Sequence, residues 1–509
     1  MIHWDDRGAK SWNGVHVTHK TRVAELIDVD NVEPGGTLVG GFDMFRNAGR
    51  YLDEVIGKAR DAGARILAIG SGWALSDINI TDGWLINTKL LNGCYDIADK
   101  YFEAGYPAAD RPCVVLAQGG MQIAELNAYL ELISKVPRSI KAAGIGNGQT
   151  VAGAVSGNTH GSQINFGAMP DFVVGLHIAT GRGRTLWIER ASKPVLNQDF
   201  CDKIEADLIR DDAVFNAAVV SFGTFGIIAA LAVETAPIFH LDFPAISDIP
   251  HDDLKTKLSG FAAADPDLYH YEFIFDPHAR NPVAMEGAAK RVPFQPNTPT
   301  PVPRWIVRDR NGYAPGINIL RVVGLLRFLP PRIPTRFQFK QYRRLALLNK
   351  VRGTPGQLYT SSIYYLEGYT ESAFGVSVKD APKMIDISSA VAREVRLPSI
   401  GQVRLVHRSR ATLGFTQHEP KTAVFEFGMI NDERFPEFER RMDAALRAEG
   451  IRYTLHWSKN SGISPAQLDY MYGAAKIASW KAARHTVFGG DATLMKMFES
   501  DAMVRAGLA

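Results

Sequence analysis

Cysteine, excess charge and long apolar runs are all scarce in this chain of 509 residues. Three cysteines, Cys94, Cys113 and Cys201, stand at unrelated spacings, so neither a disulfide framework nor a metal cluster is indicated. The net charge of +3 is too small to indicate a nucleic-acid partner. No apolar run reaches the ~18 residues that span a bilayer, and the first residues lack the layout of a signal peptide. We therefore expect a cytoplasmic protein with reduced thiols, no metal and no bound nucleic acid.

The two common phosphate-binding fingerprints, Gly-x-Gly-x-x-Gly and Gly-x-x-x-x-Gly-Lys-Ser/Thr, are also missing from the glycine-rich parts of the chain. Two such parts nevertheless stand out, residues 69–78 and 150–162. Glycine lets backbone N–H groups approach a diphosphate, and successive inward-facing amides form an anion-binding concavity. One such loop is more often an ordinary turn. Two of them, the first directly after an apolar run predicted as a strand, indicate a nucleotide and specifically a flavin.

Four segments in this order resemble the vanillyl-alcohol-oxidase (PCMH) type of FAD-binding domain, and within it the aldonolactone and polyol oxidoreductases. They are the two glycine-rich segments, residues 222–228 (Phe-Gly-Thr-Phe-Gly-Ile-Ile) and residues 455–459 (Leu-His-Trp-Ser-Lys). The resemblance covers residues 1–235 and 450–509 well and the middle in outline. It implies an α+β fold, with a two-part FAD-binding domain of this type and a cap domain in which helices flank an antiparallel sheet.

The resemblance also implies which residues contact FAD. The first segment would lie on the pyrophosphate, the second along the flavin, and the third beside the dinucleotide. The implied FAD-binding residues are Gly70, Ser71, Gly72, Trp73, Ala74, Ser76, Gly153, Ala154, Ser156, Gly157, Thr159, His160, Gly161, Gly223, Gly226 and Ile227. We expect His160 to be a structural residue beside the flavin rather than a base.

One departure from the family concerns how the cofactor is held. Relatives with a covalently linked flavin carry a histidine in the first segment, and here that position holds Trp73. An indole cannot form the histidyl bond, and residues 142–148 contain no cysteine that could form a second link. We therefore expect non-covalent, dissociable FAD.

Length and composition fit a globular enzyme with more than one domain. The chain is 46% apolar and 22% charged, and it exceeds the length that one core usually serves. We expect an FAD-binding domain at 1–235, a cap domain at 236–455, and a C-terminal segment at 456–509 that returns to the FAD domain. The expected elements are helices at 52–62, 121–130 and 436–449, a hairpin of 172–179 with 185–189, and strands at 114–118, 226–235, 359–369, 403–406 and 422–429.

Four residues are implied as the catalytic group: Gln402, Arg404, His456 and Lys459. In the related enzymes a Glu-x-Arg pair on a cap strand meets the substrate, and here it reads Gln402-x-Arg404. Residues two apart on a strand face the same way, so both can point into one pocket. An amide cannot accept a proton. Removal of the substrate's proton would then fall to His456, Lys459, or a cap residue such as Tyr364, Tyr365 or His407.

These features predict an FAD-dependent oxidoreductase that oxidises a C–OH group of a small-molecule substrate by hydride transfer to flavin N5. Loss of the glutamate, the aromatic stretch at 359–369 and the arginine- and leucine-rich stretch at 317–353 favour a bulky aromatic or otherwise hydrophobic alcohol. An aldonolactone or polyol oxidase or dehydrogenase is the alternative within the same class. A flavin-dependent reductase and a non-catalytic flavoprotein are the remaining hypotheses.

Residues 317–353 carry lysine and arginine but no acidic residue, interleaved with leucine, phenylalanine and proline. Two interpretations stay open. The segment is either a pair of packed helices whose cations are solvated or ion-paired, or a surface that contacts an anionic membrane or another acidic partner.

Overall fold

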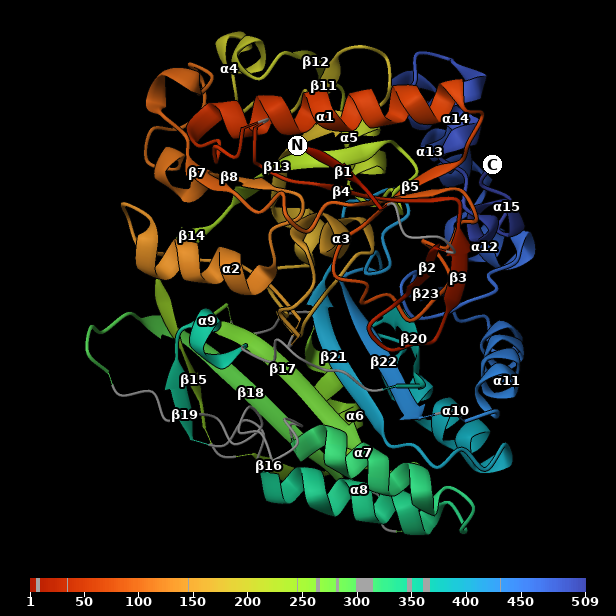
Figure 1. Ribbon diagram of the computed structural model, residues 1–509. Coiled ribbons are helices and arrows are strands. Elements are labelled where there is room, and N and C mark those ends of the chain that lie inside the picture. Colours follow the sequence, from red (N-terminus) through yellow and green to blue (C-terminus); the bar gives the residue numbers. More distant parts are fainter. Residues whose placement is uncertain are drawn as a thin grey trace.

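A computed structural model describes residues 1–5, 10–33, 35–144, 146–244, 246–261, 266–280, 283–298, 315–345, 350–359, 367–430 and 432–509. The chain forms two stacked parts (Figure 1). The upper part contains the N-terminal sheets and the C-terminal helices, and the lower part contains one large sheet. None of the described helices combines the length and the apolar run that crossing a bilayer requires.

The first sheet of the upper part has four strands, in the order β1 (Ile2–Trp4), β4 (Glu25–Val29), β6 (Trp84–Asn87) and β5 (Ile66–Ile69). Helix α1 (Gly41–Asp61) lies against it and begins earlier than the sequence indicates. Leu52, Val55, Ile56 and Ala59 recur at helical spacing and are fully buried, so one apolar stripe fixes the helix between two sheets.

The second sheet has six strands, in the order β12 (Ala206–Arg210), β11 (Thr185–Glu189), β10 (Val173–Ala179), β13 (Ile227–Glu234), β8 (Val114–Gln118) and β7 (Cys94–Asp96). The predicted hairpin is confirmed, because β10 and β11 pair antiparallel with Leu176 opposite Ile188. Both strands are buried along their whole length, which explains why they read as continuous apolar runs.

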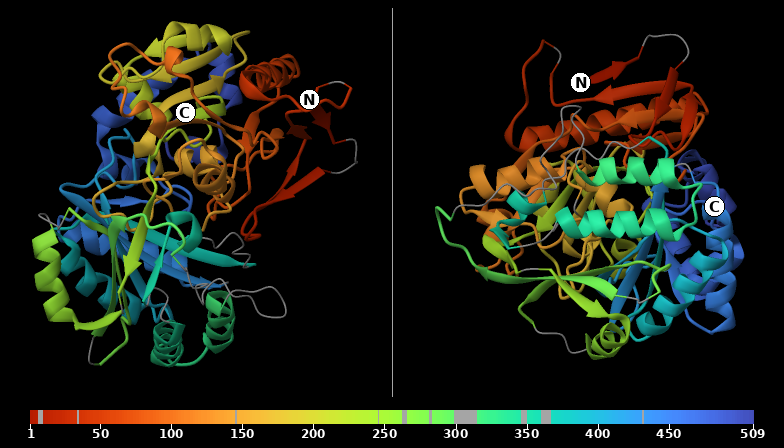
Figure 2. Two further views of the ribbon diagram at one scale, coloured as in Figure 1. Left: turned by 90° about the vertical axis from the view of Figure 1, so that its left-hand side faces the viewer. Right: turned by 90° about the horizontal axis from the view of Figure 1, so that it is seen from below.

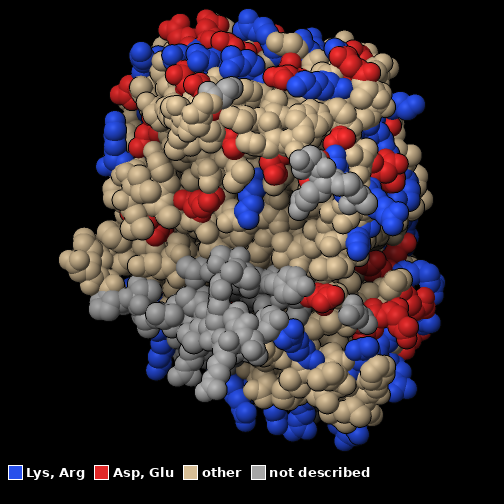
Figure 3. Space-filling view, viewed as in Figure 1, with Lys and Arg blue, Asp and Glu red and all other residues tan. Residues whose placement is uncertain are grey.

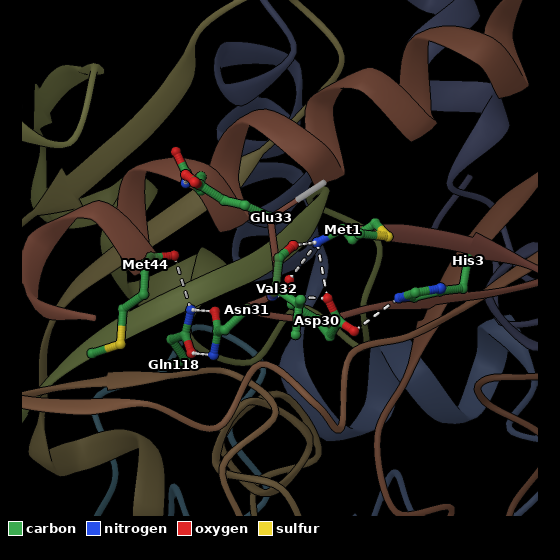
Figure 4. Close-up of polar contacts among 9 residues, drawn as sticks. Met1, His3, Asp30, Asn31, Val32, Glu33, Met44 and Gln118 are labelled. Atoms are coloured by element: carbon green, nitrogen blue, oxygen red, sulfur yellow. Dashed lines mark hydrogen bonds and ion pairs between the residues drawn. The ribbon is translucent and has the colours of Figure 1, made fainter. Parts of the chain in front are cut away.

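A pair of buried amides joins the two upper sheets (Figure 4). Asn31 Nδ2 donates to Gln118 Oε1 at 2.7 Å, and Gln118 Nε2 donates back to Asn31 Oδ1 at 2.9 Å. Gln118 Nε2 also donates to the carbonyl oxygen of Met44 in α1 at 3.1 Å. The side-chain nitrogen and oxygen of both amides thus have hydrogen-bond partners. These bonds fix the junction between the first sheet, α1 and β8.

The lower part is built on a nine-stranded sheet. Its order is β19 (Val351–Gly353), β15 (Phe239–Phe243), β18 (Val283–Pro293), β17 (Leu268–Phe275), β21 (Gly401–His407), β22 (Lys421–Ile430), β20 (Tyr369–Ser377) and β23 (Tyr453–Leu455), with β16 (Ser247–Pro250) beside β18. The central pairs are antiparallel. The α+β fold and the cap with an antiparallel sheet are thereby confirmed.

Alternation along β21 and β22 divides the cap sheet into two faces. Val403, Phe425 and Phe427 are fully buried and belong to the main apolar core. On that side lie α6 (His251–Gly260), α10 (Ala381–Glu394) and α11 (Phe435–Ala448). The alternate residues of the two strands, Gln402, Arg404 and Glu426, face the other way, toward the glycine-rich segments.

Helices α7 (Pro315–Leu326) and α8 (Arg332–Leu345) pack against each other, and α7 contacts β22. They form the face of the cap that is farthest from the N-terminal sheets (Figures 1 and 2). The described residues of this segment thus form two packed helices, and contact of their cations with a membrane or another acidic partner stays a prediction. The predicted strand at 359–369 falls mostly outside them, because only 359 and 367–369 are described.

The C-terminal helices return to the upper part of the molecule. They are α12 (Pro465–Tyr472), α13 (Ala474–Val487), α14 (Ala492–Met497) and α15 (Asp501–Arg505). Helix α13 packs against α5 (Asp212–Ala218) and α14 against α1, and the indole of Trp480 donates to the carbonyl oxygen of Val220 at 3.3 Å. The domain boundaries at 235 and 455 stay predictions.

The remaining strands and α-helices are short. They are β2 (Lys10–Asn13), β3 (Lys20–Val23), α2 (Ile123–Ala128), β9 (Arg138–Ser139), α3 (Val151–Ser156), α4 (Gln198–Lys203), β14 (Ala236–Pro237) and α9 (Pro355–Leu358).

Candidate active site

A single cavity brings the four sequence motifs together, although they are far apart in the chain. Backbone contacts fix the meeting point, because the N–H groups of Leu75 and Ser76 donate to the carbonyl oxygen of Ser458 at 2.8 and 3.2 Å. The predicted residues that line this cavity are Gly70, Ser71, Gly72, Trp73, Ala74, Gly153, Ser156, Gly157, Thr159, His160, Gly223, Gly226, Gln402, Arg404, His456 and Lys459.

Four of the predicted FAD-binding residues lie behind the cavity wall instead. The Ser76 hydroxyl donates to the carbonyl oxygen of Trp457 at 2.6 Å, and Ala154 and Ile227 are buried in apolar clusters. A Cβ atom on Gly161 would stand 2.2 Å from the carbonyl oxygen of Ala143. These four residues lie behind the residues that line the cavity and pack against them.

The first glycine-rich segment fits a bound diphosphate. Among the described residues, the backbone N–H groups of residues 71–74 have no hydrogen-bond acceptor, and these residues line the cavity. A Cβ atom on Gly70 would stand 2.1 Å from Thr150 Oγ1, so the two glycine-rich segments touch through this glycine. Gly223 has φ of +76°, a backbone conformation that only glycine adopts without strain. Successive free amides in a close-packed glycine cradle are what a phosphate requires.

Trp73 lines the cavity. It stands at the position where relatives with a covalently linked flavin carry the linking histidine. Its ring meets the ring of His16 edge to face, with centroids 5.7 Å apart, and packs over Gly146. Among the described lining residues there is no cysteine.

The opposite end of the cavity is strongly polar. Gln402 and Arg404 on β21 point into it, and so does Glu426 on β22, which stands directly opposite Gln402 in the antiparallel register. Arg404 Nη1 lies 3.2 Å from Glu426 Oε2, and Lys459 Nζ forms an ion pair with Glu426 Oε1. The Glu426 side chain is only 1% exposed, so both cations are held by a carboxylate that water does not reach.

A second carboxylate, Glu371 on β20, completes this group from the other side of Lys459. Glu371 Oε2 lies 3.2 Å from Lys459 Nζ, and Glu371 lines the cavity. Burial alone would raise the pKa of Glu426, but Arg404 and Lys459 outweigh burial and hold that pKa well below its ordinary value. Burial raises the pKa of Glu371, although Lys459 acts against it. The pKa values of these two neighbouring carboxyl groups are thereby shifted in opposite directions.

A third carboxylate orients the Gln402 amide. Gln402 Nε2 donates to Glu272 Oε2 on β17 at 2.9 Å, and Arg404 Nε lies 3.9 Å from the same oxygen. One N–H of the Gln402 amide is thereby taken up by Glu272, and its second N–H and its carbonyl oxygen remain as a donor and an acceptor for a ligand.

Glu272, Glu371 and Glu426 were not predicted from the sequence. A signal was present, because Glu272 and Glu426 are single acidic residues inside mostly apolar and aromatic strands. An isolated charge in a buried strand requires a partner, and that alone makes it a candidate site residue.

Besides Lys459, the predicted proton acceptors are His456, His407, Tyr364 and Tyr365. His160 and His456 are buried with ring centroids 5.4 Å apart, and burial lowers the pKa of His160 to about 4 and that of His456 well below its usual range. Both rings are therefore neutral at pH 7. His407 is exposed and does not line the cavity. Tyr364 and Tyr365 lie outside the described residues.

Comparison with known proteins agrees with this geometry. Residues 51–189 match the FAD binding domain family. The D-arabinono-1,4-lactone oxidases of Eremothecium gossypii and Saccharomyces cerevisiae are each 29% identical, over 38% and 46% of this chain and 31% and 35% of those proteins. The L-gulono-1,4-lactone dehydrogenase of Mycobacterium tuberculosis is 26% identical over 50% of this chain and 49% of that protein. The chain thus spans about a third to a half of these relatives.

Solved structures extend the likeness to the whole chain at the level of the fold. Cholesterol oxidase from Brevibacterium sterolicum superposes with a TM-score of 0.70 at 13% identity, covering 99% of this chain and 97% of that one. A solvent-stable cholesterol oxidase gives a TM-score of 0.70 at 14% identity over 99% and 98%. The fold and the cradle together define an FAD-binding protein with a cap domain. Residues 51–189 therefore form an FAD-binding domain, and relatives of the chain in sequence include aldonolactone oxidases and dehydrogenases.

Proposed function

We propose that this protein is an FAD-dependent oxidoreductase that oxidises a CH–OH group of a polar, multiply hydroxylated small molecule such as an aldonolactone or a polyol. The observation that carries this proposal is the buried polar group at the end of the cavity, where Arg404, Lys459, Gln402 and Glu371 converge. Several donors and acceptors in a buried site can hydrogen bond to several hydroxyl groups of one ligand. An apolar ligand would displace water from these polar groups and offer them no hydrogen bonds in return. Relatives in sequence with lactone substrates in their names support the same class.

Bound FAD would supply the hydride acceptor, and the chain's own residues would bind the substrate, orient it and take up its proton. Arg404 and Lys459 donate to substrate oxygens, and the Gln402 carbonyl oxygen accepts from a hydroxyl. Because the group is shielded from water, such charge-assisted hydrogen bonds are strong and hold the reacting carbon in one orientation.

We assign proton removal to Glu371. It lines the cavity, lies beside Lys459, and its raised pKa makes it a better proton acceptor than an ordinary glutamate. Glu426 has the opposite role, because its lowered pKa keeps it ionised while it holds Arg404 and Lys459 in place. Pairs of carboxyl groups whose pKa values are pushed apart commonly divide catalytic roles in this way.

The hydrophobic-alcohol hypothesis is less well supported. It rested in part on the replacement of a glutamate by Gln402, which was expected to remove the carboxylate from the site. Three carboxylates instead approach from neighbouring strands, at Glu272, Glu371 and Glu426. The site therefore retains the polar character that sugar-like substrates need.

We also propose that FAD is not covalently linked. The support is Trp73 in the cavity wall and the lack of cysteine among the described lining residues. Acid precipitation of the holoprotein should release all of the flavin absorbance into the supernatant. Yellow colour that stays in the pellet would show a covalent link.

The substrate class can be tested by anaerobic bleaching of the flavin absorbance. Aldonolactones and polyols should bleach the holoprotein, and aromatic alcohols and sterols should not. The Arg404→Met variant should lose bleaching while the matched surface variant Arg408→Met keeps it, because Arg408 is exposed and pairs with Glu419 instead.

Each other outcome points to a different function. Bleaching by hydrophobic alcohols alone would restore that hypothesis, and bleaching by a nicotinamide nucleotide alone would indicate a reductase. Flavin that stays oxidised with every compound would indicate a non-catalytic flavoprotein.

A further inference from the structure

Helices α7 and α8 expose a set of large apolar side chains around the turn that joins them. Leu325 is 78% exposed and Phe328 is 82% exposed. Val322, Leu329 and Ile333 add further exposed apolar surface at the same place. Contiguous apolar surface on a soluble domain marks a contact with a membrane, a partner or a ligand.

The same surface is rich in positive charge. Residues 315–353 contain nine lysines and arginines and no acidic residue. Arg332, Lys340 and Arg344 are exposed and form no ion pair with any residue that the structure describes. In Figure 3, blue side chains follow the lower edge of the molecule, where α7 and α8 lie in Figure 1.

The two helices stand at the outer end of the cap and face the viewer side by side when the molecule is seen from below (Figure 2). Among the residues that the structure describes, no other element covers their exposed face, which can therefore lie on a flat surface. Apolar side chains at the turn between the helices can enter the acyl boundary of a bilayer. The cations beside them can contact the anionic headgroups.

We propose that the α7–α8 pair docks this protein on the surface of a membrane that contains anionic phospholipids. Leu325 and Phe328 enter the boundary between headgroups and acyl chains, and Arg332, Lys340 and Arg344 contact lipid phosphates. Docking through this pair is peripheral, and it does not depend on which substrate the cavity takes.

Docking and the cavity share one structural element. Leu320 of α7 and Gln338 and Tyr342 of α8 line the cavity, whereas Leu325, Phe328 and Ile333 face outward. The helix pair is thus a wall of the candidate active site on one side and the membrane-facing surface on the other.

The test is co-sedimentation of the full-length, FAD-loaded protein with vesicles of phosphatidylcholine alone and of phosphatidylcholine mixed with phosphatidylglycerol. Binding to the mixed vesicles is expected, with weaker binding as salt is raised. The double variant Leu325→Ser, Phe328→Ser should lower vesicle partitioning by roughly tenfold or more. The double variant Arg332→Gln, Lys340→Gln should lower it by a similar factor, and only with anionic vesicles.

Leu132→Ser is the matched control. Leu132 is 82% exposed, like Phe328, but it belongs to the short π-helix Tyr129–Ile133, away from α7 and α8. This variant should bind vesicles as the unchanged protein does. Flavin content and flavin absorbance, measured on every variant, identify loss of folding.

Three outcomes would overturn the proposal. The unchanged protein could fail to bind anionic vesicles, or Leu132→Ser could reduce binding as much as the α7–α8 variants. Alternatively, sedimentation could show a dimer that the Leu325→Ser, Phe328→Ser variant dissolves without any vesicle binding, which would make this face an interface between two copies of the chain. None of these readouts depends on turnover, so failure here and failure of the proposed oxidation are distinguishable.

Discussion

Gln402 shows how one side chain can mislead when it is considered along its own strand. The amide replaces a carboxylate on β21, but it hydrogen bonds to Glu272 on one neighbouring strand and stands opposite Glu426 on the other. The negative charge of the site has not been lost. It comes from the strands on either side, and from Glu371 one strand further.

Returning a glutamate to this position should therefore harm the protein. Gln402→Glu removes the N–H donor to Glu272 Oε2, 2.9 Å away, and places two carboxylates in contact. We expect a loss of about 1–3 kcal/mol in the free energy of unfolding at pH 7, measured by urea denaturation. The double variant Gln402→Glu, Glu272→Gln restores one donor and one acceptor and should regain most of that loss. A stable Gln402→Glu single variant would contradict this account of the pair.

Glu371→Gln tests the assigned proton acceptor. We expect kcat to fall by roughly 10²–10⁴-fold, because the amide cannot take up the substrate's proton. In the unchanged enzyme, activity should rise with pH as Glu371 loses its proton, with the midpoint above the ordinary value of 4.5 because the pKa of Glu371 is raised.

The variant should lack that limb of the pH profile, which a purely structural role would not remove. The nearby exposed residue Glu367 provides the control Glu367→Gln, which should leave kcat and the profile unchanged. An unaltered profile in Glu371→Gln would assign the proton to another group.

Glu426→Gln should act mainly on stability. Arg404 and Lys459 would each lose one of their two carboxylate partners, and breaking a buried ion pair typically costs about 3–5 kcal/mol in the free energy of unfolding. The pKa of Glu426 in the folded protein lies below its ordinary value of 4.5, so its contribution is fully present above that pH and is lost as pH falls. Urea denaturation at pH 7 and at acidic pH should show a large difference from the unchanged protein at pH 7 and a smaller one in acid. Equal differences at both pH values would contradict this assignment.

At the scale of elements, the close contact between the two glycine-rich segments determines the FAD cradle. Gly70 follows β5 directly, and Thr150 caps the start of α3 with its hydroxyl, which accepts from the N–H group of Gly153. The two elements can approach only because residue 70 has no Cβ atom.

Gly70→Ala should weaken FAD binding without unfolding the protein. Its Cβ atom would stand 2.1 Å from Thr150 Oγ1, so the two segments must separate. We expect at least a tenfold rise in the dissociation constant for FAD, which corresponds to ~1.4 kcal/mol, measured by flavin fluorescence titration. Gly57→Ala in α1 is the control, because nothing lies within 4 Å of its added Cβ atom and alanine favours a helix. Unchanged FAD affinity in Gly70→Ala would remove this segment from the cradle.

At the scale of the whole molecule, the cavity joins parts that lie far apart in sequence. Its wall includes the N-terminal segments, the cap strands, α7 and α8, and the 455–459 segment. A cofactor held there contacts both the upper and the lower part, so it should stabilise the folded chain as one unit.

FAD should therefore raise the melting temperature of the apoprotein in a concentration-dependent manner. At a free concentration of 100 times the dissociation constant, binding adds ~2.7 kcal/mol to the free energy of unfolding. Thermal denaturation followed by circular dichroism at increasing FAD concentration would measure this shift. FMN, which lacks the adenosine monophosphate part, is the matched comparison and should stabilise less. No shift with FAD would contradict the proposed cofactor.

Local sequence determined the glycine-rich segments, the hairpin of β10 and β11, the strands β21 and β22, and the positions of Arg404 and Lys459. Each depends on residues close together in the chain, through glycine conformation, apolar periodicity or a short motif. Convergence of Glu272, Glu371 and Glu426 was decided by the tertiary structure alone. They lie on β17, β22 and β20, and only the antiparallel pairing of β17 with β21, of β21 with β22 and of β22 with β20 brings them to one part of the cap sheet. Their protonation follows from the same convergence, because the pKa of a buried carboxyl group is set by the charges that folding places around it.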